Sequence, residues 1–322
     1  MRKVLDEKYA IAVDLGGSHV RVALISSQGH ILSKLKESTI KTGANGTVIT
    51  RQISRLIHEV LATADQSVAK KIRGIGVASC GPLNYKKGGP EHSPNLGFPF
   101  VPLTGPLEKE FSLPVTLLND CNAAVLGEQR FGAGKGIENL VYITISTGIG
   151  AGVIANNALL LGKSGNAAEV GHFIIDTNYD FPCSCGKGVG QWEGYASGRN
   201  IPQFFKHWAR MHGKKINHEL ETAKDIFAAG RAHDRVAQEF FDELAKINAR
   251  AISNIIAAYD PELITLGGSV VLHNSSVILG GIEKYVENYI SVPPIMITKL
   301  KEDITLFGVT VTFFDKKNLR GA

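Results

Sequence analysis

The sequence predicts an α/β protein built from two domains that face a central cleft, and three observations support this. The chain has 322 residues and is 44% hydrophobic, enough for two cores at the usual domain size of about 150 residues. Apolar runs typical of buried strands alternate with segments of helical spacing. Each half opens with two apolar strands around a glycine-rich turn, so the halves share one plan.

The first half opens with a hairpin whose turn is Gly16-Gly17. Its predicted elements are strands over 9–13 and 20–26, a helical segment over 48–69, strands over 74–78 and 114–118, and a helix over 122–131.

The second half opens with another hairpin, around residues 147–150. Its predicted elements are strands over 140–146 and 150–155, helical segments over 223–259, a strand over 263–266, and a closing helix over 308–316. Residues 160–200 are rich in glycine and polar side chains and lack a long periodic element, which is typical of functional stretches.

The glycine-rich break at 132–136 places the domain boundary close by. We predict a first domain over 1–122 that also includes the closing helix (308–322), and a second domain over 123–307.

Charge and composition exclude several classes of function. The net charge of +5 is mild and scattered, so no basic face for nucleic acid stands out. The chain shows no export signal, and no apolar stretch approaches the roughly 18 residues of a membrane-spanning helix. Four cysteines in so long a chain argue against a disulfide framework, and we expect a cytoplasmic protein.

Two glycine clusters at the hairpin tips are candidate phosphate loops. Glycine lets the backbone take positive φ and approach a ligand, so that successive N–H groups can point at phosphate oxygens. Neither cluster is a Walker A motif, and a glycine hairpin is by itself often only a tight turn. The candidate residues are Gly16, Gly17 and Ser18 in the first cluster and Thr147, Gly148 and Gly150 in the second.

Two further features support nucleotide binding. Gly267-Gly268 follow a buried strand and are placed to approach the adenosine side of a nucleotide. Asp14 ends the first strand and either holds Mg²⁺ through water or caps its own turn.

Asn119-Asp120 lie between a strand and a helix, where catalytic groups often lie in an open sheet. A carboxylate there can accept the proton of an attacking alcohol, which is a role that carboxylates have in kinases. The alternative is that Asp120 only caps the helix, and the spacing leaves both open.

A second polar set, Glu169, His172 and Glu193, falls in the irregular 160–200 stretch. Carboxylates and an imidazole suit the hydroxyls of a sugar, and solvated loop charge is the alternative. His172 with Cys183 and Cys185 also resembles a zinc site, although only three of the four ligands that zinc prefers are nearby.

Taken in order, these motifs resemble the ROK family of sugar kinases and repressors, within the actin-like ATPase superfamily. The resemblance runs from about Ala10 to Gly308. The matching segments are residues 14–18 with Arg21, 76–82, 93–96, 118–124, 127–128, 147–152, 169–172, 183–186, 193, 197–198 and 260–268.

The resemblance implies two ribonuclease-H-like domains with ATP and Mg²⁺ between them, and the phosphates on the two glycine loops. It implies a sugar held by Asn119, Asp120, Glu169, His172 and Glu193, with Asn95 nearby. Asp120 would take the proton of the 6-hydroxyl. A homodimer or a higher homo-oligomer is also implied.

Two departures from the family pattern stand out. The stretch from Cys183 to Glu193 is one residue longer than the family's zinc motif, and Gln191 stands where a third cysteine belongs, which puts structural zinc in doubt. Ala168 replaces a glycine before Glu169.

The predicted function is therefore an ATP-dependent hexose kinase, with glucose as the favoured substrate. An N-acetylmannosamine kinase, or a kinase for fructose or another hexosamine, is the alternative, because the sequence does not reveal the room beside the 2-position. A repressor is not expected, since the first strand begins by about Tyr9 and leaves no recognition helix. A sugar-binding regulator without catalysis is the most distant alternative.

Overall fold

A computed structural model describes residues 7–216 and 220–315 and divides the chain into two compact units. Unit 1 comprises the described parts of Met1–Gly136, Asn157–Ala167 and Asp303–Ala322. Unit 2 comprises the described parts of Ile137–Asn156 and Ala168–Glu302. Within the described ranges, no helix has both the length and the apolar character that crossing a membrane requires.

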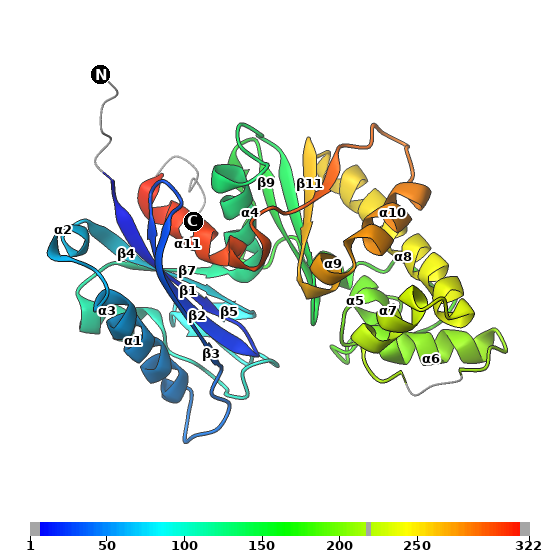
Figure 1. Cartoon of the computed structure of the whole chain (residues 1–322), viewed down its shortest axis with the longest axis horizontal. Coiled ribbons are helices and arrows are strands. Elements are labelled where there is room, and N and C mark those ends of the chain that lie inside the picture. Colours follow the sequence, from blue (N-terminus) through cyan, green and yellow to red (C-terminus); the bar gives the residue numbers. More distant parts are fainter. Residues whose placement is uncertain (1–6, 217–219, 316–322) are drawn as a thin grey trace. The chain divides into compact units, whose positions relative to one another are not determined.

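The first five-stranded sheet belongs to unit 1 and has the order β3-β2-β1-β4-β7 (Figure 1). β1 pairs with β2 and β2 with β3 in antiparallel hairpins, whereas β4 and β7 run parallel to β1. Its strands are β1 (Tyr9–Leu15), β2 (His19–Ser26), β3 (Ile31–Ser38), β4 (Ile72–Ser79) and β7 (Val115–Asn119).

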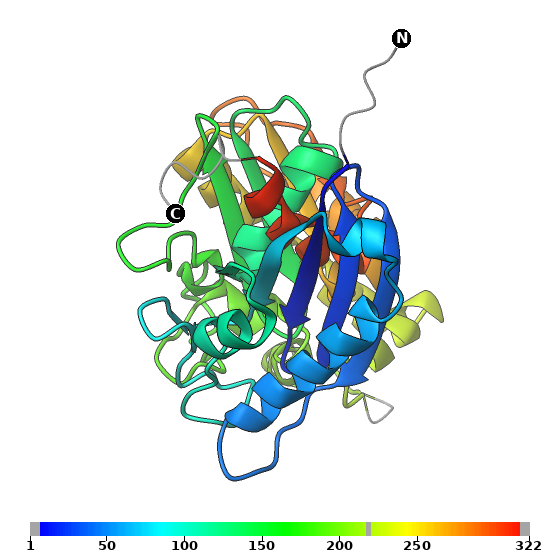
Figure 2. The ribbon, with the colours of Figure 1, turned by 90° about the vertical axis from the view of Figure 1, so that its left-hand side faces the viewer.

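Helices cover both faces of this sheet. α1 (Thr47–Leu61) buries an apolar stripe that includes Ile49, Ile53 and Ile57 against β2 and β3. Figure 2 shows α1 on one face of the sheet and the red helix α11 (Ile304–Phe314) on the other. The remaining elements are α2 (Gln66–Ala69), β5 (Leu83–Asn84), β6 (Gly89–Pro90), α3 (Thr104–Phe111) and α4 (Asp120–Phe131).

α11 packs unusually close to its neighbours because glycines line the contact. A methyl group on Gly308 would lie 1.6 Å from the carbonyl oxygen of Ala123 in α4. On the other side, a methyl group on Gly76 of β4 would lie 2.5 Å from the carbonyl oxygen of Val309. These contacts tie α4 and α11 to the first sheet, so α4 belongs to unit 1.

The second sheet has the order β10-β9-β8-β11-β12, which repeats the plan of the first. β8 and β9 form an antiparallel hairpin, and β11 and β12 run parallel to β8. Its strands are β8 (Leu140–Ile145), β9 (Ile149–Ala155), β10 (Ala158–Leu159), β11 (Leu263–Gly267) and β12 (Ile295–Ile297).

The longest helix of unit 2 is α8 (Arg235–Tyr259), which packs on α10 (Ser275–Tyr285) and on α5 (Trp192–Ala196). The side chain of Asp234 caps its start, and Asp260, in the left-handed region, ends it. The other helices and turns are α6 (Ile201–Met211), α7 (Ala223–Arg231), α9 (Ser269–His273), η1 (Val170–His172) and η2 (Lys301–Asp303).

The structure confirms the α/β class and both predicted hairpins. The closing helix begins at Ile304, four residues before the predicted start, and residues 316–322 lie outside the described ranges. Among the elements that were not predicted are β3, α3, α6, α10 and β12. The predicted domain ranges, 1–122 with 308–322 and 123–307, stay a prediction, and the first boundary between the two compact units follows Gly136.

We expect Gly308→Ala to lower the free energy of unfolding by about 1–3 kcal/mol, because the added methyl group must push α11 away from α4. Gly280→Ala is the matched control, since it is the same change inside helix α10 with no atom within 4 Å of the new methyl group. It should be neutral or stabilising by up to about 1 kcal/mol. Chemical denaturation followed by circular dichroism compares the two, and equal losses would contradict the packing argument.

Candidate functional site

In unit 1, the carboxyl ends of three parallel strands meet at one edge of the sheet. The pairing places Leu15 of β1 opposite Ser79 of β4, and Ser79 opposite Asn119 of β7. The segments that follow these strands, including the first glycine loop and Asp120, therefore emerge side by side. This is the position in which open α/β sheets bind ligands.

Asn119, rather than Asp120, is the N-cap of α4. Its side-chain oxygen accepts hydrogen bonds from the N–H groups of Cys121 at 2.9 Å and Asn122 at 3.4 Å. Asp120 occupies the first turn of the helix, where the helix dipole favours a negative charge, and is only half-buried. Oδ1 of Asp120 also accepts from the N–H of Cys121, at 2.9 Å, so this side chain helps to satisfy the start of the helix although Asn119 is the N-cap. The Nδ2 group of Asn119, the donor end of its side chain, lies beside Gly81.

The thiol of Cys80 is affected by two carboxylates at this edge. Burial, and then the negative charges of Asp120 and Asp14, raise the pKa of its thiol to about 12. The same two carboxylates thus act on one atom. This agrees with the register in placing the candidate base and the candidate phosphate-loop aspartate close together.

The first glycine loop follows β1, and the expectation that its glycines take positive φ is wrong. Neither Gly16 nor Gly17 has positive φ. Instead, a methyl group on Gly17 would lie 2.8 Å from Cβ of Asn95. Gly17 is therefore needed because Asn95, a predicted sugar residue, packs directly on the loop. Ser18 is exposed at the tip.

Asp14 is buried and held by an ion pair. Arg21 donates to its Oδ2 through both Nε, at 2.8 Å, and Nη2. Nη1 of Arg21 lies 3.7 Å from Asp303, which also pairs with Lys34 at 2.7 Å. Asp14 is therefore fixed by a partner on β2, and capping of its own turn is not needed to explain it.

In unit 2, the second glycine loop lies next to Gly267-Gly268. β11 pairs with β8 so that Gly267 faces Thr144, and the hydroxyls of Ser146 and Ser269 lie 3.0 Å apart. Gly268 has φ +87°, and a methyl group there would lie 2.5 Å from the carbonyl oxygen of Ile145. The structure thus joins two glycine clusters that are more than a hundred residues apart in the sequence.

The second loop also contacts Glu193. The N–H of Ile149 donates to Oε2 of Glu193 at 2.9 Å. A methyl group on Gly148 would lie 2.7 Å from the same oxygen. As in unit 1, a loop glycine is required because a predicted sugar residue approaches it. Thr147 is exposed, and neither Gly148 nor Gly150 has positive φ.

The charges of His172 and Glu193 both act on the carboxyl group of Glu169. Surrounding protein raises the pKa of the Glu169 carboxyl although part of that side chain reaches solvent. His172 opposes this shift, and the negative charge of Glu193 adds to it. Ala168, at φ +62°, occupies a left-handed position just before Glu169, which explains why glycine is usual there in the family.

The candidate metal ligands also cluster, because the donor atoms of His172, Cys183 and Cys185 all lie within 4.8 Å of one another. The amide of Gln191 lies beside two of these donor atoms. Oε1 of Gln191 lies 3.2 Å from Nδ1 of His172 and 3.4 Å from Sγ of Cys185. An amide oxygen is a poor substitute for a thiolate on zinc, so this donor set fits a tetrahedral zinc site incompletely.

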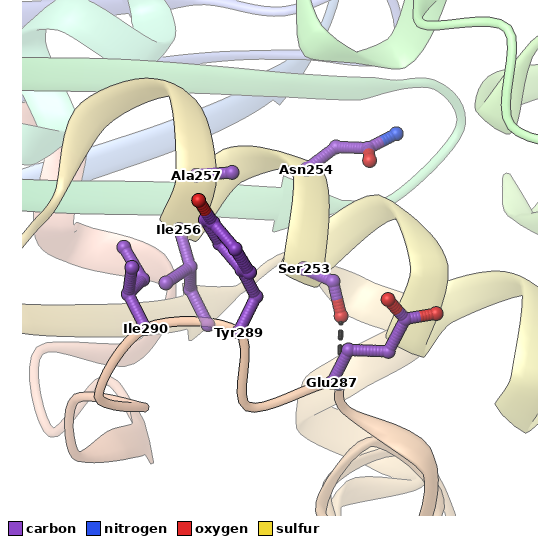
Figure 3. Close-up of a pocket in the computed structure, with 7 residues that line it drawn as sticks. All are labelled: Ser253, Asn254, Ile256, Ala257, Glu287, Tyr289 and Ile290. Atoms are coloured by element: carbon purple, nitrogen blue, oxygen red, sulfur yellow. Dashed lines mark hydrogen bonds between the residues drawn. The ribbon is translucent and has the colours of Figure 1, made fainter.

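One surface pocket lies between the end of α8 and the segment after α10 (Figure 3). The N–H of Glu287 donates to Oγ of Ser253 at its rim, at 2.9 Å. None of the predicted site residues lines this pocket. Its lining residues are Ser253, Asn254, Ile256, Ala257, Glu287, Tyr289 and Ile290.

Within each unit the structure brings predicted residues together. In unit 1 these are Asp14, Gly16, Gly17, Ser18, Asn95, Asn119 and Asp120, and in unit 2 they are Thr147, Gly148, Gly150, Glu169, His172, Glu193, Gly267 and Gly268.

One residue that anchors the candidate site and that the sequence did not reveal is Asn200. Its Nδ2 lies 2.9 Å from each of three oxygens: the backbone oxygen of Glu193 and the hydroxyls of Ser197 and Ser184. No sequence pattern distinguishes such an asparagine from one on a loop.

Comparison with known proteins gives concordant matches. The model of the ROK family matches residues 10–314. A glucokinase of Pyrobaculum calidifontis is 37% identical over 282 residues, covering 88% of this chain and 86% of its own length. A glucokinase of Halalkalibacterium halodurans is 34% identical over 272 residues, covering 83% and 82%. A structure of a ROK family glucokinase from Streptomyces griseus, in complex with glucose and AMPPNP, has a TM-score of 0.76 at 28% identity and covers 95% of this chain and 99% of its own.

Proposed function

This chain belongs to the ROK family, and from that premise we propose that it is an ATP-dependent kinase that phosphorylates the 6-hydroxyl of a hexose, with glucose favoured. The observation that carries the proposal is the shared sheet edge of Asp14, the first glycine loop and Asp120. A phosphoryl transfer needs a phosphate cradle and a carboxylate for the attacking hydroxyl, and this edge supplies both.

In the proposed reaction, the 6-oxygen of the sugar attacks the γ-phosphorus of ATP while its proton passes to the carboxylate of Asp120. The bond from the γ-phosphorus to the β,γ-bridging oxygen breaks, and ADP leaves with that oxygen. Asp120 contributes by accepting the proton and by holding the hydroxyl in line. Its half-exposed position at the start of α4 leaves it accessible to a sugar.

The sugar is proposed to be held by Asn95, Asn119, Glu169, His172 and Glu193. Carboxylates accept from sugar hydroxyls, whereas the Nδ2 group of Asn119 donates to them. The two glycine loops are proposed to bind the phosphates, and Gly267-Gly268 the adenosine side. Mg²⁺ bound with ATP neutralises the charge of the phosphates, and Asp14 is the proposed carboxylate facing it.

A cytoplasmic location and a homodimer complete the proposal. Four cysteines in a chain of 322 residues argue against a disulfide framework, which suits a reducing compartment.

The proposal is tested by a coupled ADP-release assay with ATP and Mg²⁺ across glucose, mannose, fructose, N-acetylglucosamine and N-acetylmannosamine. Preference for glucose supports the proposed substrate. Preference for N-acetylmannosamine would support the proposed phosphoryl transfer but would contradict glucose as the substrate. Absence of turnover with all five, together with sugar-induced thermal stabilisation, would replace the kinase with a sugar-binding regulator.

We expect Asp120→Asn to reduce kcat by about 10²- to 10⁴-fold or more, because the amide cannot accept the proton, while glucose affinity changes little. Asp234→Asn is the matched control at another helix start. Asp234 accepts the N–H of Ala237 at 2.8 Å, and asparagine caps equally well. Steady-state kinetics and calorimetric glucose binding compare both with the wild type. Near-normal turnover in Asp120→Asn would remove Asp120 from the role of base.

For the cluster of His172, Cys183 and Cys185 we propose that zinc is not tightly held, because Gln191 lies beside the cluster in place of a third cysteine and its amide oxygen is a poor zinc ligand. Metal analysis after dialysis should find less than about 0.1 equivalent in the wild type and close to one in Gln191→Cys, which supplies a third thiolate. Gln191→Ala removes the amide without adding a ligand and should stay low. A full equivalent in the wild type would contradict the proposal.

A further inference from the structure

Three hydrogen bonds join the second glycine loop to the segment that carries Glu193. Ile149 N–H donates to Oε2 of Glu193 at 2.9 Å. Beyond α5, the N–H of Gly198 donates to the carbonyl oxygen of Ser146 at 2.7 Å, and that of Arg199 to Thr147 at 3.4 Å. The loop is therefore held along its length by residues 193–199.

This segment is itself firmly anchored in unit 2. Nε1 of the buried Trp192 donates to Oδ1 of the buried Asn248 in α8 at 2.8 Å. Asn200, which is 6% exposed, ties the backbone oxygen of Glu193 to Ser197 and to Ser184. Ser184 belongs to the segment 183–191, here called the cysteine loop. Since its base is fixed, movement of the Glu193 carboxylate is transmitted mainly to the glycine loop that it contacts.

The two oxygens of Glu193 have different surroundings. Oε2 accepts the loop N–H, and among the described residues no hydrogen bond reaches Oε1. A carboxylate accepts at both oxygens, so Oε1 is available for a sugar hydroxyl while Oε2 holds the loop. One side chain thus faces both proposed ligands.

We propose that Glu193 couples sugar binding to phosphate binding, because the carboxylate that grips the sugar also holds the N–H of Ile149. This inference rests on the proposed function. A sugar hydroxyl on Oε1 fixes the carboxylate and with it the loop, so the phosphates bind a loop that is already ordered. By linkage, phosphates on the loop must strengthen sugar binding by the same factor.

Glu169 provides a matched comparison. It belongs to the same sugar-side cluster and interacts electrostatically with Glu193. Among the described residues, however, its side chain makes no hydrogen bond to the glycine loop. Removing either carboxylate should weaken glucose binding, but only Glu193 should link the two ligands.

The test is calorimetry of the full chain with glucose and with AMP-PNP and Mg²⁺, each alone and in the presence of the other. In the wild type, saturating AMP-PNP should tighten glucose binding by about fivefold or more. In Glu169→Ala, glucose binding should weaken, but the ratio of the glucose dissociation constants without and with AMP-PNP should stay as in the wild type. In Glu193→Ala, that ratio falls to about one, and AMP-PNP binds more weakly even without sugar.

Gly148→Ala gives an independent measurement. Its methyl group would lie 2.7 Å from Oε2 of Glu193, so the substitution displaces the Glu193 carboxylate through a change in the phosphate loop. It should raise the glucose KM although residue 148 touches no sugar in the proposal, whereas Gly280→Ala should leave it unchanged.

Three results would overturn the inference: no coupling in a wild type that phosphorylates glucose, equal loss of coupling in both glutamate variants, or unchanged AMP-PNP affinity in Glu193→Ala. A wild type that neither binds nor phosphorylates any sugar would instead overturn the proposed function.

Discussion

Both units depend on the way in which neighbouring parallel strands end in register at one edge of a sheet. In unit 1 this pairing aligns Leu15, Ser79 and Asn119, and in unit 2 it aligns Thr144 with Gly267. Each strand delivers its following loop to the same place, so residues far apart in the sequence become neighbours. The candidate base, the phosphate loops and the adenosine-side glycines all owe their positions to this pairing.

Close packing at glycine is the second constraint, and it acts in three places. Gly308 and Gly76 allow α11 to lie against α4 and the first sheet. Gly17 and Gly148 allow Asn95 and Glu193 to lie against the two phosphate loops. In each case the absent side chain makes room for a neighbour. The loop glycines therefore serve contact between protein groups, in addition to the proposed approach to a phosphate.

The cysteine loop shows how a family feature can change while its surroundings persist. Gln191 joins His172 and Cys185 through one amide oxygen, while the backbone of the loop is closed by its own hydrogen bonds, such as that from the N–H of Cys183 to Gly188 at 2.8 Å. Glu193 lies two residues beyond Gln191 and keeps its place on the second glycine loop. Hydrogen bonding within the protein thus orders a region for which the family motif implies a metal.

The sequence by itself determined the α/β class, both hairpins, most strands and the candidate residues, because periodicity and glycine clusters are local signals. The contacts that surround those residues could not be predicted from the sequence. That Asn119 rather than Asp120 caps α4, that Gly17 is required by Asn95, and that Asn200 anchors Glu193 were decided only by the tertiary structure. The physical reason is that each depends on the distance between atoms whose residues are separated along the chain or share the same local pattern, and only packing fixes those distances.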